Sequence, residues 1–196
     1  MTRPVKKSAG LLLTPGAGSS ADHPGLVAIE KALAEAVPAI AVLRMDFPYR
    51  LAGRRAPDRS PVLLDAVREG FDDLQQGLPK GAPVAVGGRS MGGRICSMAV
   101  ADGLAAGGLI CLSYPLHPPG KPERLRVEHL PDVRIPSLFV SGRKDTFGTP
   151  AELQTHLATL GGPHTLSLLD GVGHDLKGQE AKVASLVGAW LVELLR

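Results

Sequence analysis

The sequence has few aromatic residues, few cysteines and no long apolar run, and each scarcity limits the kind of protein that it can encode. Aromatic residues make up only 4% of the 196 residues although 44% are hydrophobic, so a core must be built mainly from Ala, Val, Leu and Ile. Cys96 and Cys111 both lie in apolar runs. They do not form a disulfide framework, and we expect them to be buried free thiols. No segment approaches the ~18 consecutive apolar residues of a membrane span.

The sequence also lacks an excess of charge of one sign. Its 22 basic and 19 acidic residues give a net charge of +3. Such a balance does not indicate nucleic-acid binding unless the basic residues cluster on one face. The densest basic run contains Arg50, Arg54, Arg55 and Arg59. We interpret this run first as a solvated loop and second as a rim that attracts anions.

At the N-terminus, basic residues precede apolar ones, as they do in a secretory signal peptide. The apolar run 9–13 is nevertheless shorter than the roughly 7–15 residues of a signal-peptide core, and Pro15 and Gly16 end it. We therefore expect a cytoplasmic protein that binds neither a membrane nor nucleic acid. The length predicts a single domain over residues 1–196, and the sequence does not indicate an oligomeric state.

What the sequence does have is an alternation of short apolar runs with longer amphipathic ones. The short runs show little polar alternation, which is typical of parallel strands buried on both faces. Six runs are predicted as strands, over 9–14, 39–44, 84–87, 109–113, 137–141 and 165–169. Helices are predicted over 23–37, 60–78, 91–105, 149–162 and 179–196. This repeat predicts an α/β fold, a three-layer α/β/α sandwich with about six parallel strands.

Two of the predicted helices have recognisable starting signals. Ser60 is predicted as an N-cap with Pro61 in the first helical position. Thr149 is predicted as an N-cap followed by Pro150, and Gly161 as the stop of that helix. In a parallel sheet of this kind, ligands bind at the carboxyl ends of the strands. The residues that follow each strand therefore carry the functional information.

The third predicted strand is followed by "GGRSMGG", which contains Gly88, Ser90 and Gly92 in the pattern G-x-S-x-G. This pattern is the nucleophile elbow, in which a sharp strand-to-helix turn presents a serine hydroxyl. Such a turn strains the serine backbone, and glycines remove the Cβ atoms that would block the close approach of strand and helix. Because the motif follows a buried strand and precedes a helix, Ser90 is the candidate nucleophile.

A serine needs a base beside it and a third group that orients the base. In this type of fold the chain order is Ser, then Asp or Glu, then His. Asp145 follows the fifth predicted strand, and His174 lies in a glycine-flanked loop after the sixth. We therefore predict a catalytic triad of Ser90, Asp145 and His174.

The turn also predicts an oxyanion hole made by backbone N–H groups. One donor is expected from Met91, which follows the nucleophile at a helix N-terminus. The other is expected from the loop after the first strand, "TPGAGSS", where we favour Ala17, with Gly16 next. A plain glycine turn is compatible with the same residues.

Other residues that follow strands are candidates for the substrate pocket. "RMDFPYR" follows the second strand, although its Asp46 and Arg50 are equally interpreted as residues that pin loops. The only room for a lid is the short, proline-rich segment 114–134, so we expect no large lid and an open, shallow site. The candidate pocket residues are Gly16, Asp46, Tyr49, Arg50, Arg89, Tyr114 and His117.

These residues resemble the α/β-hydrolase superfamily over nearly the whole chain. The stretches that carry the resemblance are "TPGAG", "RMDFPYR", "GGRSMGGR", "YPLHPPGKPERLR" and "SGRKDTFGTPAEL". They are most similar to a small bacterial family related to dienelactone hydrolases and to a regulatory subunit of a eukaryotic histone-acetyltransferase complex. The resemblance implies an α/β-hydrolase fold of six parallel strands, with Ser90, Asp145 and His174 on the nucleophile, acid and base. Pro15 stands where many relatives have His.

Two functions remain open from the sequence. The first is a serine hydrolase, of carboxylesterase type, that cleaves an ester, thioester or amide bond of a small-molecule substrate through an acyl-enzyme, with no metal or cofactor. Dienelactone hydrolase itself uses cysteine, so its activity is not carried over. The second is a non-catalytic protein-interaction module on the same scaffold, because a fold alone does not establish activity.

Overall fold

The computed structural model describes residues 6–195 of the chain. Six strands form one sheet in the order β2-β1-β3-β4-β5-β6, and every neighbouring pair is parallel. The predicted six-stranded parallel sheet is therefore confirmed. The strands are β1 Ala9–Thr14, β2 Ile40–Arg44, β3 Val84–Arg89, β4 Gly108–Leu112, β5 Ser137–Gly142 and β6 His164–Leu169.

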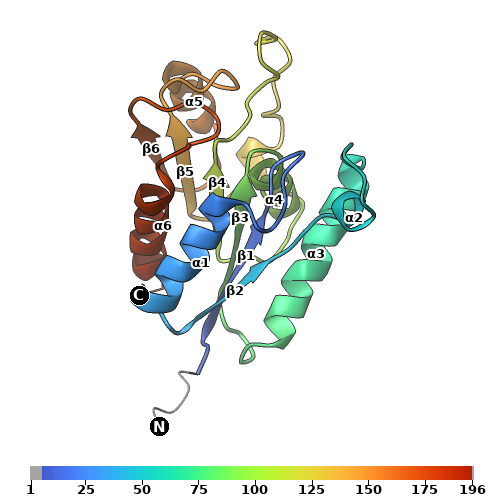
Figure 1. Ribbon diagram of the computed structural model, residues 1–196, viewed down its shortest axis with the longest axis vertical. Coiled ribbons are helices and arrows are strands. Elements are labelled where there is room, and N and C mark those ends of the chain that lie inside the picture. Colours follow the sequence, from blue (N-terminus) through green and yellow to red (C-terminus); the bar gives the residue numbers. More distant parts are fainter. Residues whose placement is uncertain (1–5, 196) are drawn as a thin grey trace.

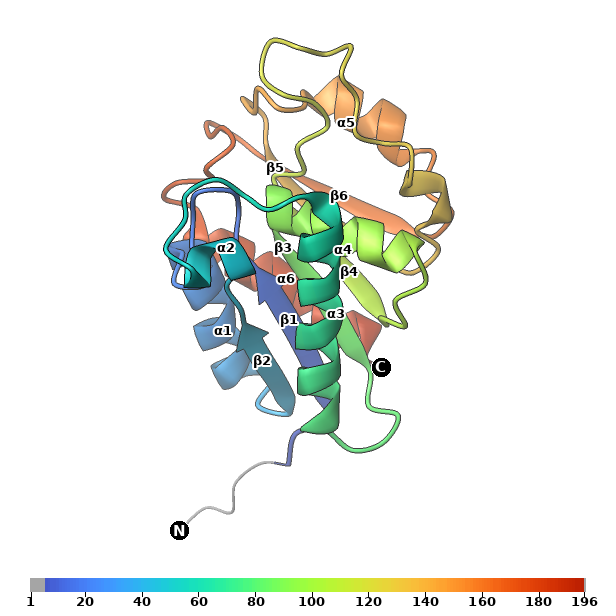
Figure 2. The ribbon, with the colours of Figure 1, turned by 90° about the vertical axis from the view of Figure 1, so that its right-hand side faces the viewer.

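Helices cover both faces of this sheet, which gives the predicted three layers (Figures 1 and 2). The helices α1 and α6 pack together on one face, over a core that includes Leu13, Ile29 and Val187. The remaining helices pack on the other face, around Phe71, Ile95 and other apolar side chains. The helices are α1 Pro24–Ala36, α2 Pro48–Leu51, α3 Ser60–Gln76, α4 Met91–Ala101, α5 Pro150–Leu157 and α6 Glu180–Leu194.

The prediction that the strands are buried on both faces holds for the centre of the sheet only. Strands β1, β4 and β5 are buried throughout, as is most of β3, but β2 is mostly half-buried and β6 begins with two exposed residues. The reason is position, because β2 and β6 are the two edge strands. Their apolar composition did not distinguish them from central strands.

The helix ends match the sequence signals unevenly. Thr149 caps α5 as predicted, in a capping box with Glu152. The prediction for Ser60 is wrong by one residue, because extended backbone at Arg59 lets α3 begin at Ser60 itself, without a side-chain cap. The prediction for Gly161 is also wrong, since α5 ends at Leu157 and Gly161 packs where a Cβ atom would overlap the backbone oxygen of Pro131.

The apolar runs of the sequence lie inside the fold. The N-terminal run that opens like a signal peptide forms strand β1, next to the middle of the sheet, while its first five residues lie outside the described ones. Cys96 and Cys111 are buried free thiols, as predicted. Within residues 6–195, no helix has the length and apolar character that crossing a bilayer requires.

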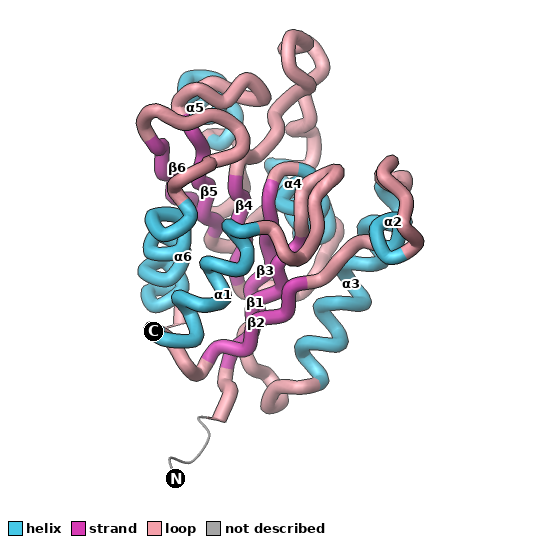
Figure 3. The backbone as a smooth tube through the Cα atoms, in the orientation of Figure 1, coloured by secondary structure: helices cyan, strands magenta, loops and turns pink. Residues whose placement is uncertain are grey.

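The strand order brings the functional loops together at one edge of the sheet. From β1 the chain turns to β2 on one side and then returns to β3 on the other, so the loops after β1 and β3 flank a topological switch point. Thr14 and Gly88, near the ends of these two strands, are direct neighbours in register. Figure 3 shows the loops that follow the strands gathered beyond this carboxyl edge.

The segment between β4 and β5 crosses this edge and contains only a single 3₁₀ turn, η1, over Leu130–Asp132. Its buried anchors include Tyr114, whose ring packs edge-on against Phe139 of β5 with the centroids 5.8 Å apart. As predicted, this segment is too short to form a large lid.

Candidate active site

Ser90 lies alone between strand β3 and helix α4, in a backbone conformation that few residues with a side chain adopt. Its φ is 50° and its ψ is −115°. Positive φ in a non-glycine residue costs on the order of 1–3 kcal/mol and persists only where the surroundings impose it. The Ser90 N–H donates to the carbonyl of Leu112 on β4 (2.8 Å), which holds this turn against the sheet.

The glycines on either side of Ser90 are required by close backbone contacts. A Cβ atom at Gly88 or Gly92 would overlap Thr14 of β1, and one at Gly93 would lie 2.6 Å from the carbonyl oxygen of Gly88. Side chains at these positions would therefore push β3, α4 and β1 apart. The sequence motif marks a place where three elements meet without room for a Cβ atom.

The imidazole of His174 lies against the hydroxyl of Ser90. His174 Nε2 is 2.8 Å from Ser90 Oγ, although the two residues are 84 positions apart in the chain. His174 lies in the loop between β6 and α6, and this loop packs against the end of β5, where a Cβ atom at Gly142 would overlap the carbonyl of Val172. The close approach of these backbones brings His174 to the centre of the carboxyl edge.

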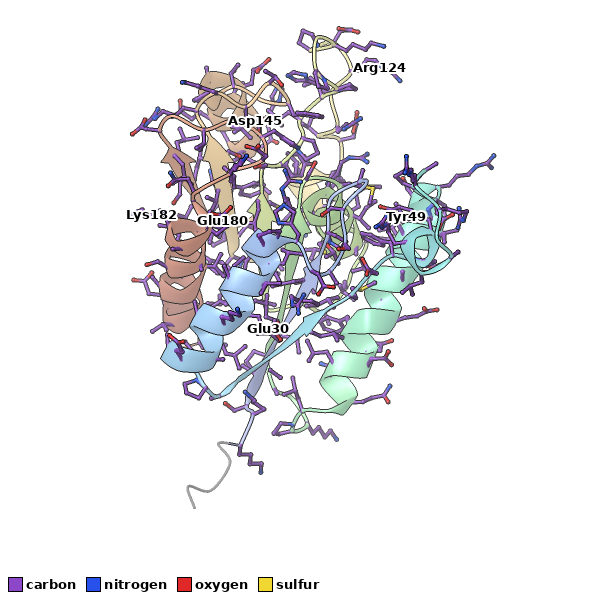
Figure 4. The ribbon with its side chains drawn as sticks, in the orientation of Figure 1. Glu30, Tyr49, Arg124, Asp145, Glu180 and Lys182 are labelled. Carbon is purple, nitrogen blue, oxygen red and sulfur yellow. The ribbon has the colours of Figure 1, made fainter. Side chains whose placement is uncertain are left out.

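Asp145 orients the other side of the same ring. Its carboxylate oxygens lie 3.0 and 2.9 Å from His174 Nδ1, and its side chain is almost completely buried. One carboxylate oxygen also accepts from the backbone N–H of Phe147 at 2.8 Å. Figure 4 labels Asp145 at the end of β5. Because a carboxylate only accepts hydrogen bonds, the proton lies on Nδ1 and Nε2 is free to accept the proton of Ser90.

Phe147 is a site residue that the sequence analysis did not identify. Its ring stacks on the imidazole of His174, with the centroids 3.9 Å apart and the planes inclined by 24°. It lies two residues after Asp145 in "KDTFG". Its position in that loop was the only signal, and nothing in the sequence distinguishes an aromatic residue that stacks on a histidine from one that joins the core.

Arg89 contacts the loop between β6 and α6 that carries His174. One of its terminal N–H groups donates to the carbonyl of His174 at 3.2 Å. Burial lowers the pKa of the Arg89 guanidinium, while the charges of Asp175 and Asp145 oppose that shift. Arg89, His23, Asp175 and Glu180 also line a cavity of about 20 Å³. This volume holds about one water molecule, and Ser90 is not among the residues that line the cavity.

The loop after β1 lies directly beside Ser90. A Cβ atom at Gly16 would be 3.5 Å from the Cβ of Ser90, so the backbone at Gly16 passes close to the Ser90 side chain. Asp46 accepts a hydrogen bond from the N–H of Ala21 (2.9 Å) and so pins this loop from the end of β2. Of the two interpretations of Asp46, the loop-pinning one matches its position. Met91 is the first residue of α4, where an N–H has no helical partner.

The other candidate pocket residues are less accessible than expected from their positions in the sequence. Tyr49 and Tyr114 are at most 1% exposed and belong to the core. His117 is buried as well, with Nδ1 2.8 Å from the carbonyl of Pro118 and Nε2 3.4 Å from Glu152. The half-buried Arg50 has a buried Nε without a hydrogen-bond partner. Among the described residues, the side-chain hydrogen bond of Ser90 is to His174 and to none of these four.

The described residues also limit the kinds of site present. Among residues 6–195, no three His, Cys, Asp or Glu side chains are grouped closely enough to hold a metal ion. Burial raises the pKa of the Cys96 thiol to about 12, and it also raises that of Cys111. The two thiols therefore stay protonated beneath the elbow, and Ser90 is the candidate nucleophile of this edge.

Comparison with known proteins places the chain in a family. The model of the alpha/beta hydrolase domain family matches residues 7–190. Among solved structures, an alpha-beta serine hydrolase homologue from Coxiella burnetii is 16% identical, with a TM-score of 0.79 over 95% of this chain and 86% of that one. A dienelactone hydrolase from Anabaena variabilis is 21% identical, with a TM-score of 0.76 over 97% and 88%.

A third similar structure is the esterase domain of a protein from Rhodothermus marinus. It is 16% identical, with a TM-score of 0.72 over 96% of this chain and 88% of that one. At these identities, the likeness to the three structures concerns the fold. The sheet order, the elbow and the similar solved structures thus all agree with the predicted α/β-hydrolase fold. Because the family model spans most of the sequence, this chain belongs to the alpha/beta hydrolase family.

Proposed function

We propose that this protein is a serine hydrolase that cleaves an ester, thioester or amide bond of a small molecule through an acyl-enzyme. The observation that carries the proposal is the continuous hydrogen-bonded chain from Ser90 Oγ through His174 to Asp145, at 2.8 Å and 2.9 Å. An esterase domain and a dienelactone hydrolase among the structural neighbours support it. The carboxylesterase type is the form of this activity that we favour.

In the proposed reaction, the Ser90 oxygen attacks the substrate carbonyl while its proton moves to His174 Nε2. Asp145 holds the ring through Nδ1–H and stabilises the imidazolium that forms. The tetrahedral intermediate then collapses, and His174 gives its proton to the leaving group. A water molecule, deprotonated by the same Nε2, attacks the acyl-enzyme and releases the acid and Ser90.

The negative charge of the tetrahedral oxygen needs donors that are already in place. We assign this role to the backbone N–H groups of Met91 and Ala17, with Gly16 as the alternative to Ala17. Met91 supplies an N–H at the start of α4, where the helix dipole favours negative charge. The loop that carries Ala17 lies against Ser90, as the contact distance at Gly16 indicates.

A fluorophosphonate probe tests the proposal, because it reacts covalently with activated serines. Wild type should be labelled, Ser90→Ala should not, and Ser60→Ala should be labelled as wild type because Ser60 belongs to α3 and not to the proposed triad. Cooperative unfolding of each variant, followed by circular dichroism, shows that the fold is retained.

The alternative is a non-catalytic interaction module on this scaffold. It rests on the resemblance of the sequence to a regulatory subunit of a histone-acetyltransferase complex, which the comparisons with known proteins do not bear out. A protein that has lost its catalytic activity has no need to keep three side chains, far apart in the sequence, within hydrogen-bonding distance of one another. Their arrangement therefore favours the hydrolase. Folded wild type that resists the probe would favour the module instead.

A further inference from the structure

Two arginines, Arg94 on helix α4 and Arg126 in the segment between β4 and β5, take no part in the proposed triad. Arg94 belongs to the first turns of α4, and its N–H donates to the carbonyl of Ser90 at 3.0 Å. Residues four apart on a helix share one face, and helical side chains lean toward the N-terminus. The half-buried Arg94 side chain therefore leans toward the end of α4 at which Ser90 lies.

Arg126 is held over the same face of α4 by the segment between β4 and β5. Its carbonyl accepts from the hydroxyl of the buried Tyr114 at 2.7 Å. Three residues further on, His129 Nε2 lies 2.8 Å from the hydroxyl of Ser97. Ser97 is three residues after Arg94 and donates to its carbonyl at 2.7 Å. These contacts hold the segment between β4 and β5 against the face of α4 that carries Arg94 and Ser97.

The two guanidinium groups are close enough to influence each other. Burial lowers the pKa of Arg126, and the positive charge of Arg94 and, to a lesser extent, that of Arg124 lower it further. Among residues 6–195, the salt bridges involve neither Arg94 nor Arg126, and Arg94 Nε is buried without a hydrogen-bond partner. Glu128, the acidic residue nearest to Arg126 in the sequence, is exposed and forms a salt bridge with neither Arg94 nor Arg126.

Two half-buried like charges without an acidic partner are costly to keep together unless an anion joins them. A guanidinium presents a planar fork of donors that matches the two oxygens of a carboxylate or phosphate. We propose that Arg94 and Arg126 bind an anionic group of the substrate, a carboxylate or a phosphate, next to the carbonyl that Ser90 attacks. This inference rests on the proposed hydrolase function and names the substrate class of the same site.

The test compares two substrates that differ in charge. One is the p-nitrophenyl monoester of glutarate, which ends in a carboxylate, and the other is p-nitrophenyl pentanoate, which ends in a methyl group. The measured quantity is the ratio of their kcat/KM values. We expect wild type to favour the glutarate ester, and Arg94→Gln and Arg126→Gln each to lower the ratio about ten-fold or more, as loss of a hydrogen bond to a charged group does.

Arg124→Gln is the matched control, because Arg124 is exposed and lies near the tip of the same segment (Figure 4). Because the charge of Arg124 also acts on Arg126, though less than that of Arg94, this variant should change the ratio less than Arg94→Gln or Arg126→Gln does. Inhibition of pentanoate hydrolysis by free glutarate and by inorganic phosphate distinguishes the two anions, and the inhibition constant of the preferred one should rise in Arg94→Gln. A ratio that responds to Arg124→Gln as strongly as to the other two variants, or to none of them, overturns the inference.

The two proposals fail in distinguishable ways. If wild type hydrolyses the pentanoate ester and is labelled at Ser90 but shows no preference for the anionic ester, the anion site is wrong and the hydrolase stands. If neither hydrolysis nor labelling occurs, the hydrolase fails, and calorimetric titration with glutarate and phosphate decides the anion site. Binding that is lost in Arg94→Gln and kept in Arg124→Gln then supports it, and the absence of binding overturns it.

Discussion

At the scale of single residues, His174 is restrained on every side. Nε2 lies against Ser90, Nδ1 against Asp145, the ring against Phe147, and the backbone carbonyl accepts from Arg89. A catalytic imidazole must keep one tautomer and one orientation while it gains and loses a proton. Asp145 fixes the tautomer, and the stacked ring of Phe147 restricts rotation of the imidazole.

We predict that Phe147→Ala lowers kcat for ester hydrolysis about ten-fold, because a ring that rotates away from Ser90 loses the aligned geometry. Steady-state kinetics with a p-nitrophenyl ester measures the effect. Thr146→Ala, at the exposed neighbouring position, should keep the wild-type kcat. If Phe147→Ala changed only KM, the ring would contact substrate and would not position the base.

The location of a site residue could be predicted from the sequence where its position relative to a strand determined its place in the fold. Ser90 directly follows β3, while Asp145 and His174 lie in the loops after β5 and β6. Parallel strands bring such residues to one edge, so pattern and chain order were enough to predict that these three side chains converge. The stacking of Phe147 and the bond from Ala21 to Asp46 depend on loop conformations that no periodicity encodes. The burial of Tyr49 could not be foreseen either, because the short helix α2 was not predicted.

At the scale of elements, the elbow depends on β1, β3 and α4 approaching one another more closely than side chains allow. The contact is between backbones, since a Cβ atom at Gly92 would lie 2.5 Å from the carbonyl oxygen of Pro15. Backbone atoms of a strand end cannot move aside as a flexible side chain can. The loop after β1 and the start of α4 are therefore coupled through Gly92.

Gly92→Ala should lower the free energy of unfolding by about 2 kcal/mol or more, because the added methyl group forces these backbones apart. Urea denaturation measures the loss. Gly107→Ala is the control, since a Cβ atom there would have its nearest neighbours at ordinary contact distances of 3.7 and 3.8 Å. Equal stability of the two variants would show that the elbow has more room than these contacts indicate.

Helix starts were predictable to the extent that a side chain performs the capping. Thr149 and Glu152 hydrogen-bond each other's backbone N–H groups, and this reciprocal pattern is visible in the sequence. Ser60 makes no such bond, and backbone geometry at Arg59 sets the start of α3. Gly161 shows the opposite case, in which a residue typical of a helix end serves tertiary packing.

At the scale of the whole molecule, burial of histidines makes the fold sensitive to acid. Burial, together with the charge of Arg94, lowers the pKa of His129 to about 4. Burial lowers the pKa of His23 as well, and its Nδ1 accepts the N–H of Gly25 at 3.1 Å in the cap of α1. Both residues are held neutral in the folded state, whereas they bind a proton near pH 6.5 in the unfolded chain.

The stability contributed by neutral His129 is therefore complete above pH 6.5 and is lost as the pH falls from 6.5 toward 4, where the unfolded chain binds the proton first. After allowance for partial solvent screening, we expect a loss of about 2 kcal/mol. Urea denaturation at pH 7.5 and pH 4.5 should show a smaller loss in His129→Gln than in wild type. His164→Gln, at an exposed position of β6, should lose as much as wild type. Identical losses in all three proteins would contradict this origin of the acid sensitivity.

The separation of the interacting side chains along the chain has a consequence for synthesis. Ser90 leaves the ribosome 84 residues before the imidazole that lies against it, and Asp145 precedes that imidazole by 29. On the proposed mechanism, a nascent polypeptide carries an inert hydroxyl until its sixth strand has been translated and docked at the border of the sheet. Hydrolytic competence is thus acquired late, and only by chains in which β6 has joined the sheet.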